Sequence, residues 1–290
     1  MEAIVSILSR LSLKALYRLA DYVIYPVAYY IVRYRRRLVY ANLRHSFPDK
    51  TEEERKQIEK RFYHQFADVI VEIIYGYRVS DEEMRERIQF VNGEETAHLT
   101  HEFGGNLLML GHIGNWEWMA EVSHYMEQFG IDSTHVYRKQ RSEATNRLML
   151  KMRRRRGGDY CDKNLILRTM ILQRKRERPQ SYGMISDQKP STHGEHYVTE
   201  FLHQTTPFLT GTEQLSKKLG YPVFFFYIRK RKRGYYTAEF RLLTDKPKET
   251  ADGEITEAYA RMLEENILEC PELWLWTHNR WRLIKQQLKE

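Results

Sequence analysis

The stretch Asn106-Leu-Leu-Met-Leu-Gly-His-Ile-Gly-Asn-Trp-Glu-Trp-Met119 decides the fold class of this chain. It opens with the apolar run 107–110, which has the length of a buried strand rather than of a helix. Two glycines then flank His112 and loosen the backbone around it. Asn115 is a good helix cap, and the residues after it favour a helix. The stretch therefore predicts a strand, a turn and a helix, and such turns commonly bind ligands in α/β sheets.

The chain repeats this alternation of strands and helices from residue 88 onward. We expect strands at 88–91, 106–110, 133–137, 181–185, 223–228 and 235–243. We expect helices between them at 94–103, 116–129, 143–156, 163–175 and 212–219, with a last helix at 254–268. This order predicts an α/β fold in which a mixed sheet carries helices on both faces.

Residues 1–46 predict helices that anchor the chain on a membrane. Arg10, Lys14 and Arg18 recur every four residues and share one helical face, while apolar residues line another. The stretch 22–32 has no charge, but a bilayer crossing needs about 20 apolar residues. Extending the stretch far enough to span would bury charged residues in the membrane. We favour an interfacial anchor over a single span; a soluble helical hairpin packed on the core is the remaining possibility.

Helix caps mark the beginning of the second region. Thr51-x-x-Glu54 and Ser80-x-x-Glu83 have the pattern of capping boxes, and the first opens a long helix. We therefore expect residues 47–87 to form a helical lead-in. Together with the strands and helices that follow, it makes residues 47–290 one α/β domain behind the anchor helices of residues 1–46.

The composition favours an anionic partner. Lys and Arg number 47 against 39 Asp and Glu, a net charge of +8. Basic runs at 153–156, 174–178 and 229–233 suit anionic lipid headgroups or an acidic carrier protein, although a solvated surface also accounts for them. Nucleic acid fits less well, because aromatic residues are not interleaved with these runs. Cys161 and Cys270 imply neither a disulfide framework nor a zinc site.

Glu117 follows His112 by five positions, and the two can meet only across a strand–helix turn. On one continuous helix, five residues advance about 500° and place the side chains on different faces. If His112 precedes the helix, Glu117 can accept a hydrogen bond from Nδ1 and leave Nε2 free as a general base. Backbone N–H groups of Gly114 and Asn115, with Arg138, would then hold an oxyanion. A half-buried histidine with satisfied hydrogen bonds is the alternative.

The sequence GHIGNWEW at 111–118 resembles the His-x4-acid block of the glycerolipid-type acyltransferases. Its Gly-His-x-x-Asn-Trp-Glu form is similar to the late acyltransferases of lipid A biosynthesis, the lauroyl and myristoyl transferases. Further blocks agree in order over residues 40–285: Tyr137-Arg138, Asn146, the basic run 153–156, Asp187-Gln188, 208–212 with 221–223, and 271–281. The segment 193–203 matches poorly. The resemblance implies a glycerolipid acyltransferase-like fold.

The resemblance also implies an O-acyltransferase at the cytoplasmic face of the inner membrane. The donor would be a thioester of acyl carrier protein, and the acceptor a hydroxyl on a 3-hydroxyacyl chain of a Kdo-bearing lipid A precursor. No cofactor or metal is needed, because the thioester is already activated. Beside the catalytic pair, residues of the matching blocks are expected to bind substrate: Tyr137, Asn146, Arg156, Asp187, Thr210, Gly211 and Thr212.

Two alternatives to this activity stay open at the level of sequence. The same chemistry could act on another membrane lipid, such as a phospholipid, a glycolipid or an amino lipid. Less favoured is a non-enzymatic protein that binds anionic membranes through its basic residues. Neither the acyl chain length nor the hydroxyl that is acylated follows from the sequence.

The segment 193–203 contains four residues that could suggest a metal site: His193, Glu195, His196 and His203. In a strand or loop, however, the spacing His-x-x-His directs the two side chains to different sides, and no local pattern completes a closed zinc site. We therefore expect no metal, and interpret the segment as a polar loop that lines a groove.

Overall fold

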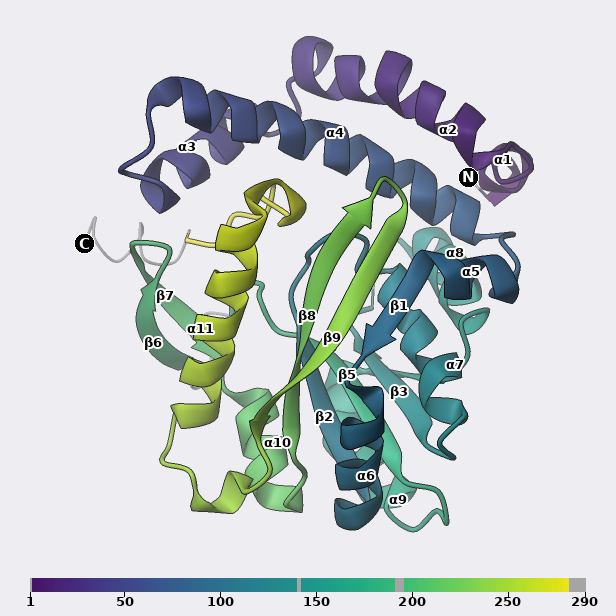
Figure 1. Ribbon diagram of the computed structural model, residues 1–290, viewed down its shortest axis with the longest axis vertical. Helices are drawn as coiled ribbons and strands as arrows, with labels where there is room; N and C mark the ends of the chain where they lie inside the picture. Colours follow the sequence, from purple (N-terminus) through teal and green to yellow (C-terminus); the bar gives the residue numbers. More distant parts are fainter. Residues whose placement is uncertain (1, 140–141, 191–195, 282–290) are drawn as a thin grey trace.

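The computed structural model describes residues 2–139, 142–190 and 196–281. Seven strands of these residues form one mixed sheet in the order β1-β9-β8-β2-β5-β3-β4 (Figure 1). Their bounds are Ile88–Val91 (β1), Gly105–Leu110 (β2), Asp132–Tyr137 (β3), Asp159–Asp162 (β4), Gln180–Ile185 (β5), Val223–Lys232 (β8) and Tyr235–Thr244 (β9). Strands β8, β2, β5, β3 and β4 are parallel, whereas β9 and β1 run the opposite way at one edge. The predicted α/β fold with a mixed sheet is confirmed.

The six predicted strands are present, and the structure adds three that the sequence did not predict. Strand β4 is short and lies at the sheet edge, so it lacks the apolar run of a central strand. Strands β6 (His196–Phe201) and β7 (Gln204–Leu209) form a separate antiparallel hairpin. The expectation of a loop over residues 196–201 was therefore wrong: only Phe201 of β6 is fully buried, so the strand lacks the apolar run by which buried strands are recognised.

Helices lie on both faces of the sheet. On one face, the ring of Phe225 contacts that of Tyr259 in α11 (Glu254–Glu269), at 5.8 Å between centroids. Helices α9 (Ile166–Gln173) and α10 (Gly211–Leu219) share this face. Phe226 points to the opposite face, because successive strand residues alternate. That face is covered by η3 (Trp118–Glu121), α7 (Val122–Glu127) and α8 (Glu143–Arg154), while α6 (Gly93–Phe103) connects β1 to β2.

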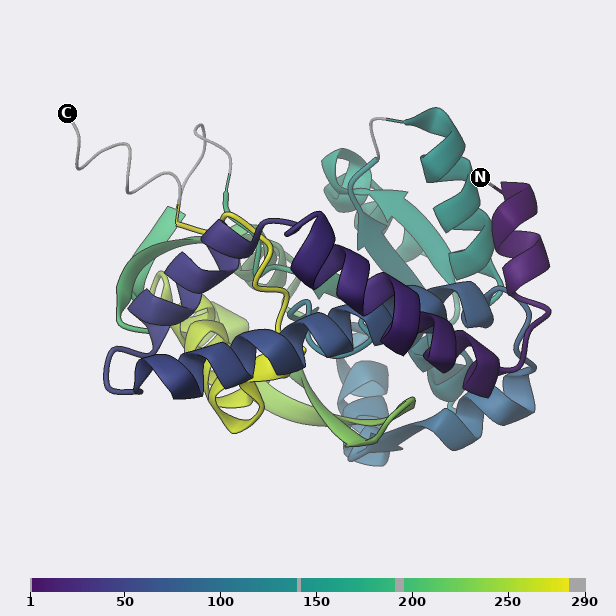
Figure 2. The same ribbon diagram turned by 90° about the horizontal axis from the view of Figure 1, so that it is seen from above.

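A layer of helices crosses the carboxyl ends of the parallel strands (Figures 1 and 2). Its longest member is α4 (Glu52–Gly76), which begins at the predicted capping box of Thr51 and Glu54. Ser80 caps α5 (Asp81–Arg87) as predicted. The remaining helical segments are α1 (Glu2–Leu8), α2 (Leu13–Leu19), the π-helical turns η1 (Ala20–Ile24) and η2 (Val27–Ile31), α3 (Arg36–Ser46), η4 (Lys163–Leu165), η5 (Pro247–Glu249) and η6 (Pro271–Leu273).

The segment from α2 to η2 packs along α4 with one side and leaves the other side exposed (Figure 2). Leu16, Ala20 and Tyr29 are buried against the core, whereas Tyr22 and Ile31 are mostly exposed. In the part of the chain that the structure describes, no helix has both the length and the apolar character that crossing a bilayer requires.

Candidate active site

The side chains of His112 and Asp187 meet beyond the carboxyl ends of two adjacent strands. Leu110 and Ile185 lie side by side at the ends of β2 and β5, and the polar group follows two residues after each strand end. The Nδ1 atom of His112 is 2.6 Å from Oδ1 of Asp187, and the backbone N–H of His112 donates to Oδ2 at 2.8 Å. The carboxylate thus fixes both the backbone and the ring of the histidine.

Asp187 is buried and remains ionised. Trp274 donates its indole N–H to Oδ2 at 2.8 Å. Burial acts to raise the pKa of Asp187, but the neighbouring His112 and these hydrogen bonds together lower it to about 2. An ionised carboxylate accepts the proton of Nδ1, so Nε2 of His112 carries the lone pair. That nitrogen is 3.2 Å from Nε2 of Gln188 and faces a cavity.

Glu117 is not the partner of His112. Its carboxylate forms two hydrogen bonds with Arg153 of α8, from Nε at 2.7 Å and from Nη2 at 2.6 Å. The predicted hydrogen bond between Glu117 and His112 Nδ1 was therefore wrong. The reason is the register of the sheet, which brings Asp187 to Nδ1, while the turn after His112 directs Glu117 towards α8.

The backbone N–H of Gly114 is not available to an oxyanion, contrary to expectation. It donates to the carbonyl of Leu273 at 2.9 Å, because residues 273–275 pair with the turn that holds His112. Gly114 has a φ of 58°, and a Cβ there would lie 3.0 Å from the ring of Tyr236, so the turn requires glycine. Asn115 is fully buried, and its Oδ1 accepts the N–H of Trp118, in partial agreement with the predicted cap.

The cavity in front of His112 has a volume of about 650 Å³. Much of its wall is apolar: Leu108, Leu110, Met119, Ala120, Val122, Val136, Ile185 and Phe226. The polar part of the wall includes Tyr137, Arg138, Lys139, Ser142 and Thr145. Cavities of this size hold small-molecule ligands, and the combination suits a chain with one apolar and one charged end.

The structure brings some of the predicted site residues to this cavity and leaves others away from it. His112, Glu117, Tyr137 and Arg138 line it, and Asp187 stands directly behind His112. The other predicted residues do not line it: Gly114, Asn115, Asn146, Arg156, Thr210, Gly211 and Thr212. Arg156 is buried and bonded to protein groups, among them Glu121 and the carbonyl of Val79. Thr210 and the next two residues open α10.

A second histidine, His135, lies in the cavity wall, and no sequence pattern indicated it. Its Nε2 is 2.7 Å from the hydroxyl of Ser123 in α7. Burial first, and the charge of Arg153 second, lower the pKa of His135 to about 4, so the ring is neutral at physiological pH. Trp274 and Gln188 were part of the matching sequence blocks, but nothing in their spacing from His112 predicted contact with the catalytic pair.

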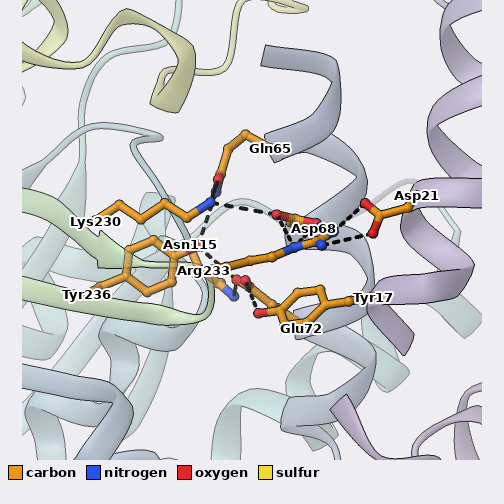
Figure 3. Close-up of polar contacts among 9 residues, drawn as sticks. All are labelled: Tyr17, Asp21, Gln65, Asp68, Glu72, Asn115, Lys230, Arg233 and Tyr236. Carbon is orange, nitrogen blue, oxygen red and sulfur yellow. Dashed lines mark hydrogen bonds and ion pairs between the residues drawn. The ribbon is translucent and has the colours of Figure 1, made fainter. Parts of the chain in front are cut away.

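Behind the turn that carries His112 lies a buried polar cluster centred on Glu72 of α4 (Figure 3). Its carboxylate accepts hydrogen bonds from the hydroxyl of Tyr17 at 2.8 Å, Nδ2 of Asn115 at 2.9 Å and the hydroxyl of Tyr236 at 2.9 Å. Burial raises the pKa of Glu72 despite these donors. One carboxyl group thus joins an N-terminal helix, the β8–β9 hairpin and the turn next to His112.

Arg233, at the tip of the β8–β9 hairpin, joins the hairpin to η1 and to α4 (Figure 3). It donates to Asp21 of η1 at 2.9 and 2.6 Å, and also to Asp68 of α4. Lys230 adds a hydrogen bond to Gln65 at 2.5 Å. Two members of the basic run 229–233, Lys230 and Arg233, are therefore engaged by protein groups.

No group of three or more His, Cys, Asp or Glu side chains is arranged as metal ligands within residues 2–139, 142–190 and 196–281. His193 and Glu195, two members of the conceivable metal group, lie outside the described residues. His196 begins β6 and His203 lies in the turn between β6 and β7.

Comparison with known protein families identifies the family of the chain. Residues 3–283 match a family model described as bacterial lipid A biosynthesis acyltransferase. No curated protein matches the chain. The family match covers nearly the whole sequence, including every residue of the cavity wall.

Proposed function

Since the chain belongs to the bacterial lipid A biosynthesis acyltransferase family and is an acyltransferase, we propose that His112 is its general base and that Asp187 orients it. The family implies an acyl donor and a lipid A or related glycolipid acceptor, and it excludes the non-enzymatic alternative. The observation that supports this assignment best is the 2.6 Å contact between Nδ1 and the buried carboxylate, which leaves Nε2 facing the cavity.

The reaction follows from that arrangement. Nε2 of His112 takes the proton of an acceptor hydroxyl, and the oxygen attacks the carbonyl carbon of an acyl thioester. The negative charge that develops on the carbonyl oxygen is stabilised by the amide N–H of Gln188 and by Arg138. The C–S bond then breaks, and the proton on Nε2 passes to the departing thiolate. Asp187 stabilises the positively charged imidazolium in between.

The donor in this proposal is acyl carrier protein. Its fatty acyl chain occupies the apolar part of the cavity, along Leu108, Met119 and Phe226. Arg138 and Lys139 lie on the polar side, where they attract the phosphate of the pantetheine arm and the acidic carrier. The thioester is already activated, so the proposed reaction needs no cofactor.

The acceptor in this proposal is a hydroxyl of a 3-hydroxyacyl chain on a lipid A precursor, which gives an acyloxyacyl ester. Tyr137 lies on the cavity wall next to Arg138 and is the predicted substrate-binding residue best placed to contact it. Another membrane lipid with a free hydroxyl is the alternative acceptor. Mass spectrometry of the lipids of a deletion strain distinguishes the two.

We place the enzyme at the cytoplasmic face of the inner membrane, with residues 1–46 lying in the interface and residues 47–290 carrying the chemistry. The exposed side chains of Ile7, Tyr22 and Ile31 support this contact, since large apolar side chains gain free energy by entering the lipid boundary. Anionic lipid would attract the basic residues of the same region.

The test of the proposed function is acyl transfer from a defined acyl carrier thioester to a lipid A precursor. His112→Ala removes the base, so turnover should fall by about 10²–10⁴-fold. Circular dichroism should still show a folded protein, while thermal stability should fall modestly because the buried carboxylate of Asp187 loses its contact with the ring. Wild-type turnover by the variant would refute the proposed role of His112.

A further inference from the structure

A separate hollow of about 520 Å³ lies at the beginning of α3. We call it the arginine pocket, and its lining residues are Arg33, Arg35, Arg36, Arg37, Tyr40 and Glu59. Four guanidinium groups face one carboxylate there, so the lining carries a net charge of +3. Nothing in the acyl-transfer mechanism uses these residues.

The single carboxylate is already engaged by one of the four arginines. Arg36 donates to Glu59 through Nε at 2.9 Å and through Nη2 at 3.4 Å, and its guanidinium lies 4.0 Å from the ring centroid of Tyr29. Arg36 therefore holds η2 and α3 against α4. The remaining three arginines keep their positive charge without a carboxylate.

The side chains of Arg33 and Arg37 are exposed and form no hydrogen bond or ion pair with any of the described residues. Arg35 uses Nη1 to donate to the carbonyl of Thr277 at 2.9 Å and has its other N–H groups available. Arg33 and Arg35 adopt left-handed φ angles of 51° and 53° in the turn before α3, and both side chains line the pocket together with Arg37. Three guanidinium groups are thus held together with unused donors.

The surface beside the arginine pocket is apolar. Tyr30, Ile31 and Val32, which directly precede it, are 58%, 72% and 63% exposed. Within the described residues, ten of the eighteen exposed large apolar side chains fall between residues 4 and 34. A soluble anion would leave this apolar surface exposed to water, whereas a membrane lipid presents a charged group and an apolar layer together.

We propose that the arginine pocket binds the phosphate monoester of a membrane lipid. A phosphate monoester offers three terminal oxygens and a charge of about −1.5 to −2, which matches three free guanidinium groups. A carboxylate has two oxygens and one charge, so it satisfies this set less well. The planar fork of arginine suits phosphate better than the point charge of lysine.

The pocket is also connected to the active site. The carbonyl that holds Arg35 belongs to Thr277, and two residues earlier Leu275 donates its N–H to the carbonyl of His112 at 3.1 Å. A lipid phosphate in the arginine pocket would therefore set the orientation of the catalytic turn relative to the membrane surface.

The test compares three double variants of the full-length chain. Arg33→Ala/Arg37→Ala removes two free guanidiniums, and Arg33→Lys/Arg37→Lys keeps the charge but removes the fork. Arg174→Ala/Lys175→Ala removes the same charge after α9, near the amino ends of the strands. Arg35 and Arg36 are retained because they bind protein groups. Unchanged thermal unfolding confirms that each variant is folded.

Binding is measured by flotation with phosphatidylcholine vesicles that contain either phosphatidic acid or oleic acid, adjusted to equal surface potential. Wild type should bind vesicles that contain phosphatidic acid more tightly than vesicles that contain oleic acid. Both substitutions at 33 and 37 should weaken that binding by about tenfold or more, because the bidentate contacts are lost. The Arg174→Ala/Lys175→Ala control should change it less than about twofold, because these residues lie away from the proposed contact surface.

Three results would overturn the proposal. The first is that the lysine variant binds vesicles with phosphatidic acid as well as wild type does. The second is that wild type binds vesicles with oleic acid as tightly as vesicles with phosphatidic acid. In either case general charge attraction explains the contact, and no phosphate site exists. The third is that calorimetry shows binding of inorganic phosphate that depends on Arg33 and Arg37, while vesicle binding does not depend on them. The pocket would then bind a free anion rather than a lipid. The assay does not involve acyl transfer, so its outcome is independent of the catalytic assignment.

Discussion

Replacing Asp187 by asparagine would invert the hydrogen bonding around His112. Three N–H donors converge on this carboxylate: the backbone N–H of His112 and the indole of Trp274 on Oδ2, and Nδ1 of His112 on Oδ1. Asparagine keeps one oxygen, which satisfies two donors only in the Oδ2 position. Its NH₂ group then faces Nδ1, which must accept a hydrogen bond. The ring proton moves to Nε2, and the base is lost.

The expected loss of kcat for Asp187→Asn is about 10⁴-fold, the cost of the wrong tautomer in hydrolases with the same His–Asp arrangement. This corresponds to about 5 kcal/mol of transition-state free energy. The assay is single-turnover acyl transfer with saturating donor, and KM for the donor should change little.

The stability of the fold also reports on the pair. Because the pKa of Asp187 is lowered in the folded state, the ionised carboxylate stabilises the wild type at pH values above its unfolded pKa of about 3.9. This stabilisation is lost as pH falls towards 2, and the asparagine variant should not show this pH dependence.

Glu117→Gln is the matched control, because it removes one carboxylate charge from the same cavity and leaves the contacts of Asp187 intact. It breaks the ion pair with Arg153, whose members are 14% and 19% exposed, and should lower thermal stability. Its kcat should exceed that of Asp187→Asn by about tenfold or more, since the tautomer of His112 is unchanged. A larger loss of kcat in Glu117→Gln than in Asp187→Asn would refute the assignment of Asp187 as the orienting residue.

Two further substitutions test other parts of the structure. Ala120→Phe adds bulk to the apolar wall of the cavity, so transfer of the longest accepted acyl chain should fall roughly tenfold, while transfer of shorter chains should change little. Competition between thioesters of different chain length measures this preference. An unchanged preference would mean that the acyl chain binds elsewhere. Glu72→Gln removes a buried acid whose pKa is raised in the fold. Wild type should lose stability relative to this variant as pH rises above about 4.5, because the buried acid resists ionisation. Urea unfolding of both proteins between pH 5 and 8 should show this difference in the free energy of unfolding. If the two free energies run parallel with pH, Glu72 is ionised throughout.

The alternation of strands and helices was predictable because buried parallel strands form short apolar runs with helical sequences between them. The partner of His112 was not, because contact between β2 and β5 depends on strand order, which no local pattern encodes. Glu117 follows His112 by only five positions along the chain, and this proximity was misleading. Asp187 was recognised at a strand end, but its role emerged once the register placed it beside His112. The hairpin of β6 and β7 was missed because β6 has only one fully buried residue and β7 contains a proline, so neither strand forms the apolar run that marks a buried strand.

The cluster around Glu72 and Arg233 determines how a detergent-free form of the enzyme should be made. Deleting the N-terminal helices would remove Tyr17 and Asp21, so Glu72 would lose one of its donors and Arg233 one of its carboxylates. The support of the turn next to His112 would weaken together with the membrane contact. Solubility is better sought by replacing outward-facing side chains such as those of Tyr22 and Ile31 with polar ones, which leaves every contact of the cluster in place.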